Sequence, residues 1–209
     1  MRTAVFGATG GVGSQLVEQA TNAGREVTAV VRDASKLAAR PGLTVVPADV
    51  MQPAAIAPAI ADSDAVVSAL GSRGMRTPSS ICTDGATSIV RAMHDTGVHR
   101  LVVVSASGLA HGGDGPLVRL LVKPILGAVL KHPFADMRAM EDVVRDSGLD
   151  WTIVRPPQLT DGPRTGTYHS RVALNVRGSY RISRADVADC LLRCLTQHGP
   201  IGAPVSIAS

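Results

Sequence analysis

The sequence predicts an α/β fold in which helices cover both faces of a mainly parallel β-sheet, and two observations support this. Short apolar runs rich in Val and Ile alternate with longer segments of helical periodicity along the chain. This alternation is typical of parallel sheets, because each helix returns the chain to the edge where the previous strand began. A glycine-rich turn follows the first apolar run directly. With 209 residues, of which 45% are hydrophobic, the chain is expected to form one domain over residues 1–209.

The strands are expected where short apolar runs occur, because both faces of a parallel sheet are buried. In chain order they are Thr3–Phe6, Val27–Val31, Thr44–Val46, Ala65–Ala69, Leu101–Val104, Trp151–Val154, Tyr180–Ile182 and Val205–Ile207. The helices are expected where apolar residues recur at helical spacing and small-residue stop signals follow. They are Val12–Ala23, Ala54–Ala61, Pro78–Thr96, Asp136–Ser147 and Arg184–Thr196, the last with Ser183 as its cap.

Two loops, expected at about 107–133 and 155–180, follow late strands, and residues 107–118 and 155–180 are rich in glycine, proline and polar residues. Such loops lie over the carboxyl edge of the sheet, where folds of this kind bind their ligands. We therefore expect both to be substrate loops.

The charge pattern argues against a nucleic-acid partner. The net charge is +4, but the basic residues are mostly single arginines, and aromatic residues that could stack on bases make up only 2% of the chain. An anionic small molecule explains local positive charge better. The low aromatic content also offers no anchor for a large interface, so we expect a monomer or a weak homodimer.

No segment predicts a membrane span or an export signal. The most apolar late stretch, 117–130, contains charged residues, proline and glycine and is shorter than the ~20 residues a bilayer requires. No signal-peptide pattern fits the start of the chain, so a cytoplasmic location is expected. Cys82, Cys190 and Cys194 lack metal-ligand spacing, and we expect them to pack in the core with no metal bound.

The stretch "AVFGATGGVGSQLVEQA" carries the strongest functional signal. Glycines recur in a G-x-x-G-x-x-G pattern between the first strand and the first helix. Glycine permits a tight turn and lets backbone N–H groups approach a pyrophosphate at the helix N-terminus. The pattern predicts a Rossmann-like dinucleotide site built from Gly7, Thr9, Gly10, Gly11, Val12 and Gly13.

The end of the second strand favours NADP(H) over NAD(H). Enzymes that bind NAD carry an acidic residue near this point, which holds the ribose hydroxyls. Here Arg32 and Lys36 can instead hold a 2′-phosphate. Asp33 is the counter-argument, although it could equally cap the turn "DASKL".

Other candidate cofactor residues follow the later strands. Asp49 and Val50 could border the adenine, or they could cap the next helix. After the fourth strand, Leu70, Gly71, Ser72 and Arg73 reach the carboxyl edge, where Arg73 could meet a phosphate or simply be solvated. Ser105 and Ser107 end the fifth strand near the expected nicotinamide edge. Either could contact the substrate or the cofactor there as a catalytic residue, although serines also cap strand ends. Pro156 and Pro157 follow the sixth strand, where backbone groups would face the nicotinamide carboxamide.

Several stretches together resemble the atypical short-chain dehydrogenases, in the branch of NmrA-like and NAD(P)H-binding proteins. They are "FGATG", "EVTAVVRDASKL", "DAVVSALGSRG" and "SGLDWTIVRPPQLTDGPRTGTY". Within that branch the chain is most similar to the NADPH-dependent flavin and biliverdin reductases. The resemblance implies a Rossmann-like fold, a nicotinamide cofactor contacted by the two prolines, and substrate contacts at Ala106, Phe134 and Leu159. It also marks departures: a flavin-site serine of those reductases falls at Ala106, and a histidine falls at Glu141.

The stretch "HPFADMRAM" lacks the Tyr-x-x-x-Lys pair with which ketone-reducing short-chain dehydrogenases supply a proton. Phe134 and Arg138 stand there instead, and neither can act as that acid. Phe134, Arg138 and Glu141 recur at i, i+4 and i+7, so they could share one helix face as an apolar wall, an anion partner and a proton relay. Alternatively, Arg138 and Glu141 form only an exposed i, i+3 pair.

The sequence therefore predicts an NADPH-dependent reductase that transfers a hydride to a conjugated acceptor such as a flavin or quinone. Such an acceptor delocalises the charge it receives and needs no acid from the enzyme. Two alternatives remain open: a non-catalytic NmrA-like sensor that binds NADP(H) and a protein, and a reductase of a specialised biosynthetic intermediate. A sensor could fill the space above the nicotinamide with side chains from 116–132.

Overall fold

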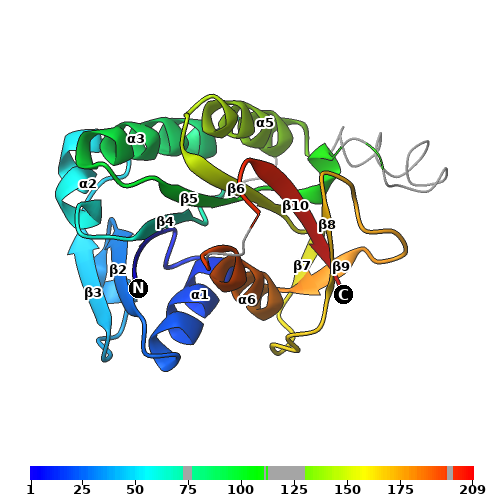
Figure 1. Ribbon diagram of the computed structural model, residues 1–209, viewed down its shortest axis with the longest axis horizontal. Helices are drawn as coiled ribbons and strands as arrows, with labels where there is room; N and C mark the ends of the chain where they lie inside the picture. The colour runs from blue at the N-terminus through cyan, green and yellow to red at the C-terminus, as the bar shows by residue number, and fades with distance from the viewer. Residues whose placement is uncertain (73–76, 111, 113–129, 197–199) are drawn as a thin grey trace.

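A computed structural model describes residues 1–72, 77–110, 112, 130–196 and 200–209 of the chain. At its centre lies an eight-stranded sheet in the order β3-β2-β1-β4-β5-β6-β10-β8 (Figure 1). All neighbouring strands pair in parallel except β8, which runs antiparallel to β10. The strands are β1 (Arg2–Phe6), β2 (Glu26–Val31), β3 (Leu43–Pro47), β4 (Ala65–Ser68), β5 (Arg100–Val104), β6 (Asp150–Arg155), β8 (His169–Val172) and β10 (Ala203–Ala208). The predicted fold class is confirmed.

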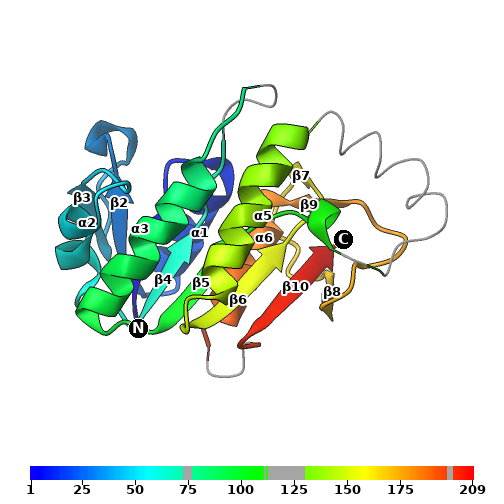
Figure 2. The same cartoon turned by 90° about the horizontal axis from the view of Figure 1, so that it is seen from above.

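Helices cover both faces of this sheet (Figure 1). One face carries α1 (Gly11–Asn22) and α6 (Arg184–Cys194), which pack against each other. The other carries α2 (Pro53–Ile60), α3 (Ile81–Thr96) and α5 (Lys131–Arg145), and Figure 2 shows α3 and α5 side by side across the strands. None of the described helices combines the length and the apolar character needed to cross a membrane.

The core consists of two apolar layers because side chains alternate along each strand. In β1, Val5 packs in the layer beneath α1 and α6, while Ala4 and Phe6 pack in the layer beneath α2, α3 and α5. All three side chains are fully buried. This burial on both faces explains why the strands appear in the sequence as continuous apolar runs.

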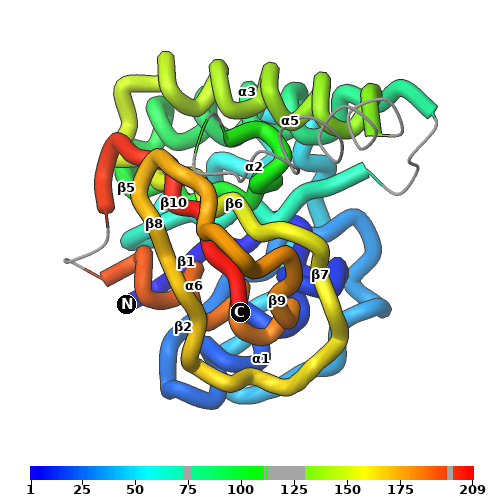
Figure 3. The backbone as a smooth tube through the Cα atoms, turned by 90° about the vertical axis from the view of Figure 1, so that its right-hand side faces the viewer, coloured from blue at the N-terminus to red at the C-terminus, as the bar shows by residue number. Residues whose placement is uncertain are grey.

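The C-terminal third differs from the sequence prediction. The predicted strand at 180–182 exists as β9 (Arg181–Ser183), but it pairs only with β7 (Gln158–Thr160) in a separate two-stranded sheet. Strand β8 was not predicted, because its four residues are all exposed and show no apolar alternation. Figure 3 shows these three strands grouped at one end of the molecule. Their pairing depends on partners distant in sequence, which local patterns cannot reveal.

Two helix starts also differ from the prediction. Helix α3 begins at Ile81 rather than Pro78, where the Asp136 side chain from α5 accepts hydrogen bonds from the backbone N–H groups of Cys82 and Thr83, at 3.1 and 2.9 Å. Helix α5 begins at Lys131, five residues before the predicted start. Its first turn contains Pro133, which is tolerated there because the first N–H groups of a helix have no intrahelical partner.

Candidate functional site

The glycine turn between β1 and α1 forms a backbone cradle. Gly7 has a φ of +77°, a conformation that favours glycine, and its carbonyl accepts a hydrogen bond from the N–H of Gly10 at 2.9 Å. A Cβ atom at Gly13 would lie 2.1 Å from the same carbonyl oxygen, so only glycine permits this approach of helix to strand. The first turn of α1 contains no acidic residue, and its N-cap, Gly10, provides no side-chain cap. Exposed N–H groups at a helix N-terminus fit an anionic pyrophosphate.

A cavity of about 410 Å³ lies above this cradle, at the carboxyl ends of the central strands. Its size falls in the ordinary range for small-molecule sites, about 300–1,000 Å³. The predicted cofactor residues on its wall are Gly7, Thr9, Gly10, Gly11, Val12, Arg32, Lys36, Val50, Leu70, Gly71, Ser72 and Ser105. Gly13, Asp49, Pro156 and Pro157 do not belong to the wall, and Arg73 lies outside the described residues.

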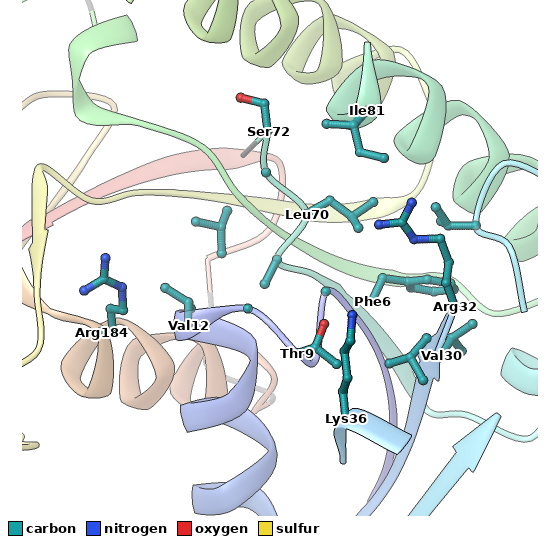
Figure 4. Close-up of a pocket in the computed structure, with 18 of the residues that line it drawn as sticks. Phe6, Thr9, Val12, Val30, Arg32, Lys36, Leu70, Ser72, Ile81 and Arg184 are labelled. Carbon is teal, nitrogen blue, oxygen red and sulfur yellow. The ribbon is translucent and has the colours of Figure 1, made fainter. Parts of the chain in front are cut away.

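Two cations define one end of the cavity. Arg32, which follows β2, and Lys36 in the short helix η1 (Ala34–Lys36) extend toward it from the same side (Figure 4). Asp33 between them caps η1, since its carboxylate accepts from the N–H of Ser35 at 3.1 Å and from the Ser35 hydroxyl at 2.6 Å. These bonds, the hydroxyl bond first, hold the pKa of Asp33 below its ordinary value. The carboxylate is thus engaged within η1, as the capping interpretation predicted.

The neighbouring wall is apolar. Ala48, Val50, Leu70 and Ile81 all line the cavity. Asp49 instead caps a turn, where its carboxylate accepts from the N–H of Met51 at 3.1 Å. Of the two residues expected at the adenine, only Val50 therefore reaches the wall.

A buried hydrogen-bonded cluster adjoins the opposite end. Ser105, just beyond β5, lines the cavity, and its hydroxyl donates to a carboxylate oxygen of Glu141 on α5 at 2.6 Å. Arg155 at the end of β6 donates to the same carboxylate through Nε at 2.8 Å and through Nη2, and Arg145 adds a bond at 2.6 Å. Burial acts to raise the pKa of Glu141. The hydrogen bonds from Arg155 and Ser105, with the charges of Arg155 and Arg145, outweigh it, so the pKa lies below its ordinary value.

The structure does not assemble the helix face predicted from residues 134, 138 and 141. Glu141 is only 2% exposed and faces Arg155, whereas Arg138 is exposed and absent from the cavity wall. The simple alternative of an exposed Arg138–Glu141 pair is wrong, because Glu141 is buried and pairs with Arg155 and Arg145. Phe134 packs against Gly108, where an added Cβ would lie 2.6 Å from its ring. None of the three residues lines the cavity.

The remaining predicted residues divide between wall and support. Leu159 lines the cavity. Ala106 is the N-cap of the short helix η2 (Ser107–Leu109), and Ser107 is its first residue. The N–H of Ser107 donates to the carbonyl of Pro156 at 2.9 Å. Pro156 therefore joins two loops rather than lining the cavity, and neither Ser107 nor Ala106 reaches the wall.

The sequence prediction missed two arginines. Arg184, the first residue of α6, lines the cavity beside Gly11 and lies opposite Arg32 and Lys36 (Figure 4). Its guanidinium pairs with the Asp161 carboxylate at 2.5 Å, and that carboxylate is 90% exposed. Arg155 is the buried partner of Glu141. The sequence signal for each was weak, because a single arginine after a strand or at a helix start is common on surfaces.

Residues with metal-ligating side chains do not gather in this site. Within the described parts of the chain, no group of three or more His, Cys, Asp or Glu residues could hold a metal ion.

Known proteins share both the sequence pattern and the fold. A family model described as NAD(P)H-binding matches residues 7–198. A Bacillus subtilis protein named as an uncharacterized sugar epimerase, YhfK, is 32% identical over 204 residues, which cover 94% of this chain and 89% of that protein.

Two solved structures show the same fold. One, from Streptococcus pneumoniae and named a "putative NADH-flavin reductase", has a TM-score of 0.81 at 24% identity, covering 100% of this chain and 99% of that chain. The other is a Veillonella parvula short-chain dehydrogenase/reductase in complex with NADP. It has a TM-score of 0.82 at 17% identity and covers 100% of this chain and 94% of that chain. The family match over most of the chain, together with the glycine cradle, shows that the chain belongs to the NAD(P)H-binding family.

Proposed function

We propose that the protein is an NADPH-dependent reductase that transfers a hydride to a flat, conjugated acceptor of the flavin or quinone type. One observation carries the proposal. The cavity joins a cationic end, at Arg32 and Lys36, to an end near Ser105 whose described wall offers no free acid. The bound cofactor would supply the hydride, and the chain would supply binding and orientation.

The composition of the Ser105 end supports an acid-free reaction. Val104, which precedes Ser105, lines the cavity with apolar surface, as do Val12, Met137 and Leu159, and the Ser105 proton is already donated to Glu141. A ketone would become an alkoxide that requires a proton from a positioned acid. A flavin or quinone spreads the negative charge over its rings and can take its proton from water, so close approach to the cofactor is the main requirement.

The cationic end supports NADPH as the preferred cofactor. Arg32 and Lys36 lie on one side of the cavity, where a 2′-phosphate would add a charge-assisted interaction with either cation. Asp33, the residue that could have held ribose hydroxyls, is committed to Ser35 and Lys36. The names of the structural neighbours point both ways, one to NADH and one to NADP.

The test is NADPH oxidation, followed at 340 nm, with FMN, riboflavin, menadione and a simple ketone as separate acceptors. We expect turnover with the flavins or the quinone, none with the ketone, and slower turnover with NADH. Arg32→Ala should remove most of the preference for NADPH over NADH, because the 2′-phosphate loses its bidentate partner. Ketone reduction at a rate comparable to flavin reduction would contradict the acid-free proposal.

The same assay addresses the second candidate, an NADP(H)-binding sensor without catalysis. The absence of a Tyr-x-x-x-Lys pair suits that function equally well. The segment 116–132, whose side chains could fill the cavity of a sensor, lies largely outside the described residues. Tight NADPH binding with no oxidation by any of the acceptors would favour the sensor and contradict the reductase.

A further inference from the structure

We propose that Ser105 acts toward the cavity as a hydrogen-bond acceptor, and that Glu141 and Arg155 are positioning residues that impose this polarity. The ligand group that it accepts from is the primary carboxamide N–H of the nicotinamide ring. The inference rests on the proposed function only in placing the nicotinamide at the Ser105 end of the cavity.

The position of Ser105 is fixed by the strands on either side of it. Its backbone N–H donates to the carbonyl of Val154 at 2.8 Å, which extends the pairing of β5 with β6 by one residue. The residue is only 3% exposed, yet it belongs to the cavity wall. A ligand in the cavity therefore meets a serine that is almost fully shielded from bulk water.

The Glu141 carboxylate determines the direction of the Ser105 hydroxyl. Two guanidinium groups, from Arg155 and Arg145, donate to this carboxylate, and both Glu141 and Arg155 are buried. An ionised carboxylate can only accept hydrogen bonds. The 2.6 Å bond between Ser105 and Glu141 is therefore donated by the serine, and with the arginine bonds it stabilises the buried charge on Glu141.

The Ser105 hydroxyl can therefore only accept a hydrogen bond from a ligand in the cavity. A hydroxyl has a single proton, and here that proton is committed, so only oxygen lone pairs remain for the ligand. A ketone or ester oxygen would meet a second acceptor and lose a partner, whereas an amide N–H would be satisfied. The nicotinamide ring carries one donor, the carboxamide NH₂. The ribose hydroxyls beside it can also donate, and the experiment below separates the two because its analogue changes only the carboxamide.

The experiment compares two nucleotides that differ only at this group. NADP⁺ carries the carboxamide, and its 3-acetylpyridine analogue carries an acetyl group, which has no N–H. We expect titration calorimetry to show wild-type protein binding NADP⁺ about fivefold or more tightly than the analogue, as one neutral hydrogen bond allows. Ser105→Ala should weaken NADP⁺ binding by a similar factor and leave the analogue unchanged, so that the two affinities converge.

Ser206→Ala is the matched control. Ser206 is a buried serine on β10 whose hydroxyl donates to Asn175 at 3.1 Å, and it does not line the cavity. This variant should keep the wild-type ratio of the two affinities. Glu141→Gln tests the positioning role, because it removes the charge that commits the serine proton while leaving Ser105 in place. The affinity ratio should then fall toward that of Ser105→Ala.

Two results would overturn the inference: Ser105→Ala weakening the acetyl analogue as much as NADP⁺, or changing neither. The first would mean that Ser105 contacts a group that both nucleotides carry, and the second that no ligand group contacts it. Both measurements use binding without an acceptor, so they separate this inference from the reductase proposal. If the protein discriminates between the two nucleotides but none of the acceptors leads to NADPH oxidation, only the reductase proposal is contradicted.

Discussion

At the scale of single residues, the cofactor cradle depends on positions where no side chain fits. Gly13 lies in the first turn of α1, directly against the carbonyl of Gly7, whereas Gly71 on the cavity wall has open space around its Cα. The two glycines thus have different roles although both belong to the candidate site. Gly13 permits close packing of helix on strand, and Gly71 leaves room above the cavity.

Gly13→Ala should destabilise the protein by about 1–3 kcal/mol, the usual cost of overpacking a tight contact. The added Cβ would lie 2.1 Å from the Gly7 oxygen and 2.9 Å from the Ala8 Cα. In a helix without such a contact, alanine is about 1 kcal/mol more favourable than glycine. A loss of stability in Gly13→Ala would therefore come from the clash between the added Cβ and the Gly7 carbonyl. Urea unfolding measures this change, and Gly71→Ala should stay within about 0.5 kcal/mol of wild type. Equal stability of the two variants would contradict the packing argument.

The Glu141 cluster gives a pH-dependent contribution to stability. The pKa of Glu141 is lowered in the folded protein, while an unfolded glutamate titrates near about 4.3. A lowered pKa stabilises the folded state above the unfolded pKa, and that stabilisation is lost as the pH falls through the folded pKa.

Glu141→Gln should therefore be roughly 3–5 kcal/mol less stable than wild type at pH 7, because a buried arginine loses its partner charge. The difference should narrow as the pH falls below the unfolded pKa of about 4.3, because the unfolded wild-type chain then binds a proton that the folded protein does not. Urea unfolding of both proteins from pH 7 down to pH 3 measures this. A stability difference that stays constant over that range would mean that Glu141 has the same pKa in the folded and the unfolded protein.

At the scale of elements, helix α6 organises the loop after β7. Asp186 in its first turn accepts from the N–H groups of Thr165 and Gly166, both at 2.8 Å, and from the Thr165 hydroxyl at 2.9 Å. Burial acts to raise the pKa of Asp186, but these hydrogen bonds outweigh it and the pKa is lowered. One turn later, Asp189 pairs with Arg164 and Arg193. The acidic face of α6 thus holds one predicted substrate loop in place.

Asp186→Ala should release this loop and lower the free energy of unfolding by about 1–3 kcal/mol, since two backbone N–H groups lose their acceptor. Limited trypsin digestion should then cut after Arg164 much faster than in wild type, because the exposed arginine would sit on a mobile segment. Asp142→Ala, which removes an exposed carboxylate from α5, serves as the control and should leave the digestion pattern unchanged. Unaltered cleavage in Asp186→Ala would show that other contacts hold the loop.

At the scale of the whole molecule, the two-layered core shields all three cysteines. Cys82 packs in the layer beneath α2, α3 and α5, and Cys190 and Cys194 pack in the layer beneath α1 and α6. Burial raises the pKa of the Cys82 thiol to about 12, so very little reactive thiolate forms near neutral pH. Chemical access to these thiols therefore requires opening of the fold.

In the native protein at pH 8, we expect that none of the three thiols reacts with a chromogenic disulfide reagent within minutes. All three should react promptly in concentrated urea, and the labelling rate should follow the fraction unfolded. NADP⁺ should slow labelling further if it binds only the folded state. Fast reaction of one thiol without denaturant would reveal local opening of the layer in which that cysteine lies.

Much of this architecture was already predictable from local patterns. The alternation of strand and helix, the glycine turn and the cap by Ser183 all depend on residues a few positions apart, and the structure contains each of them. The cationic end of the cavity was predictable for the same reason, because Arg32 and Lys36 follow β2 directly. Periodicity, turns and caps depend on neighbouring residues, so the sequence itself predicts them.

The chemistry of the Ser105 end was not predictable in that way. Ser105, Glu141 and Arg155 come from three different elements, and their hydrogen bonds join residues 36 and 14 positions apart. The exposed strand β8 and the isolated β7–β9 pair likewise depend on distant partners. Local residue order therefore specified the fold class and the cofactor cradle. Packing of the layers decided which side chains are buried together, and so which of them are charged and which protons are committed.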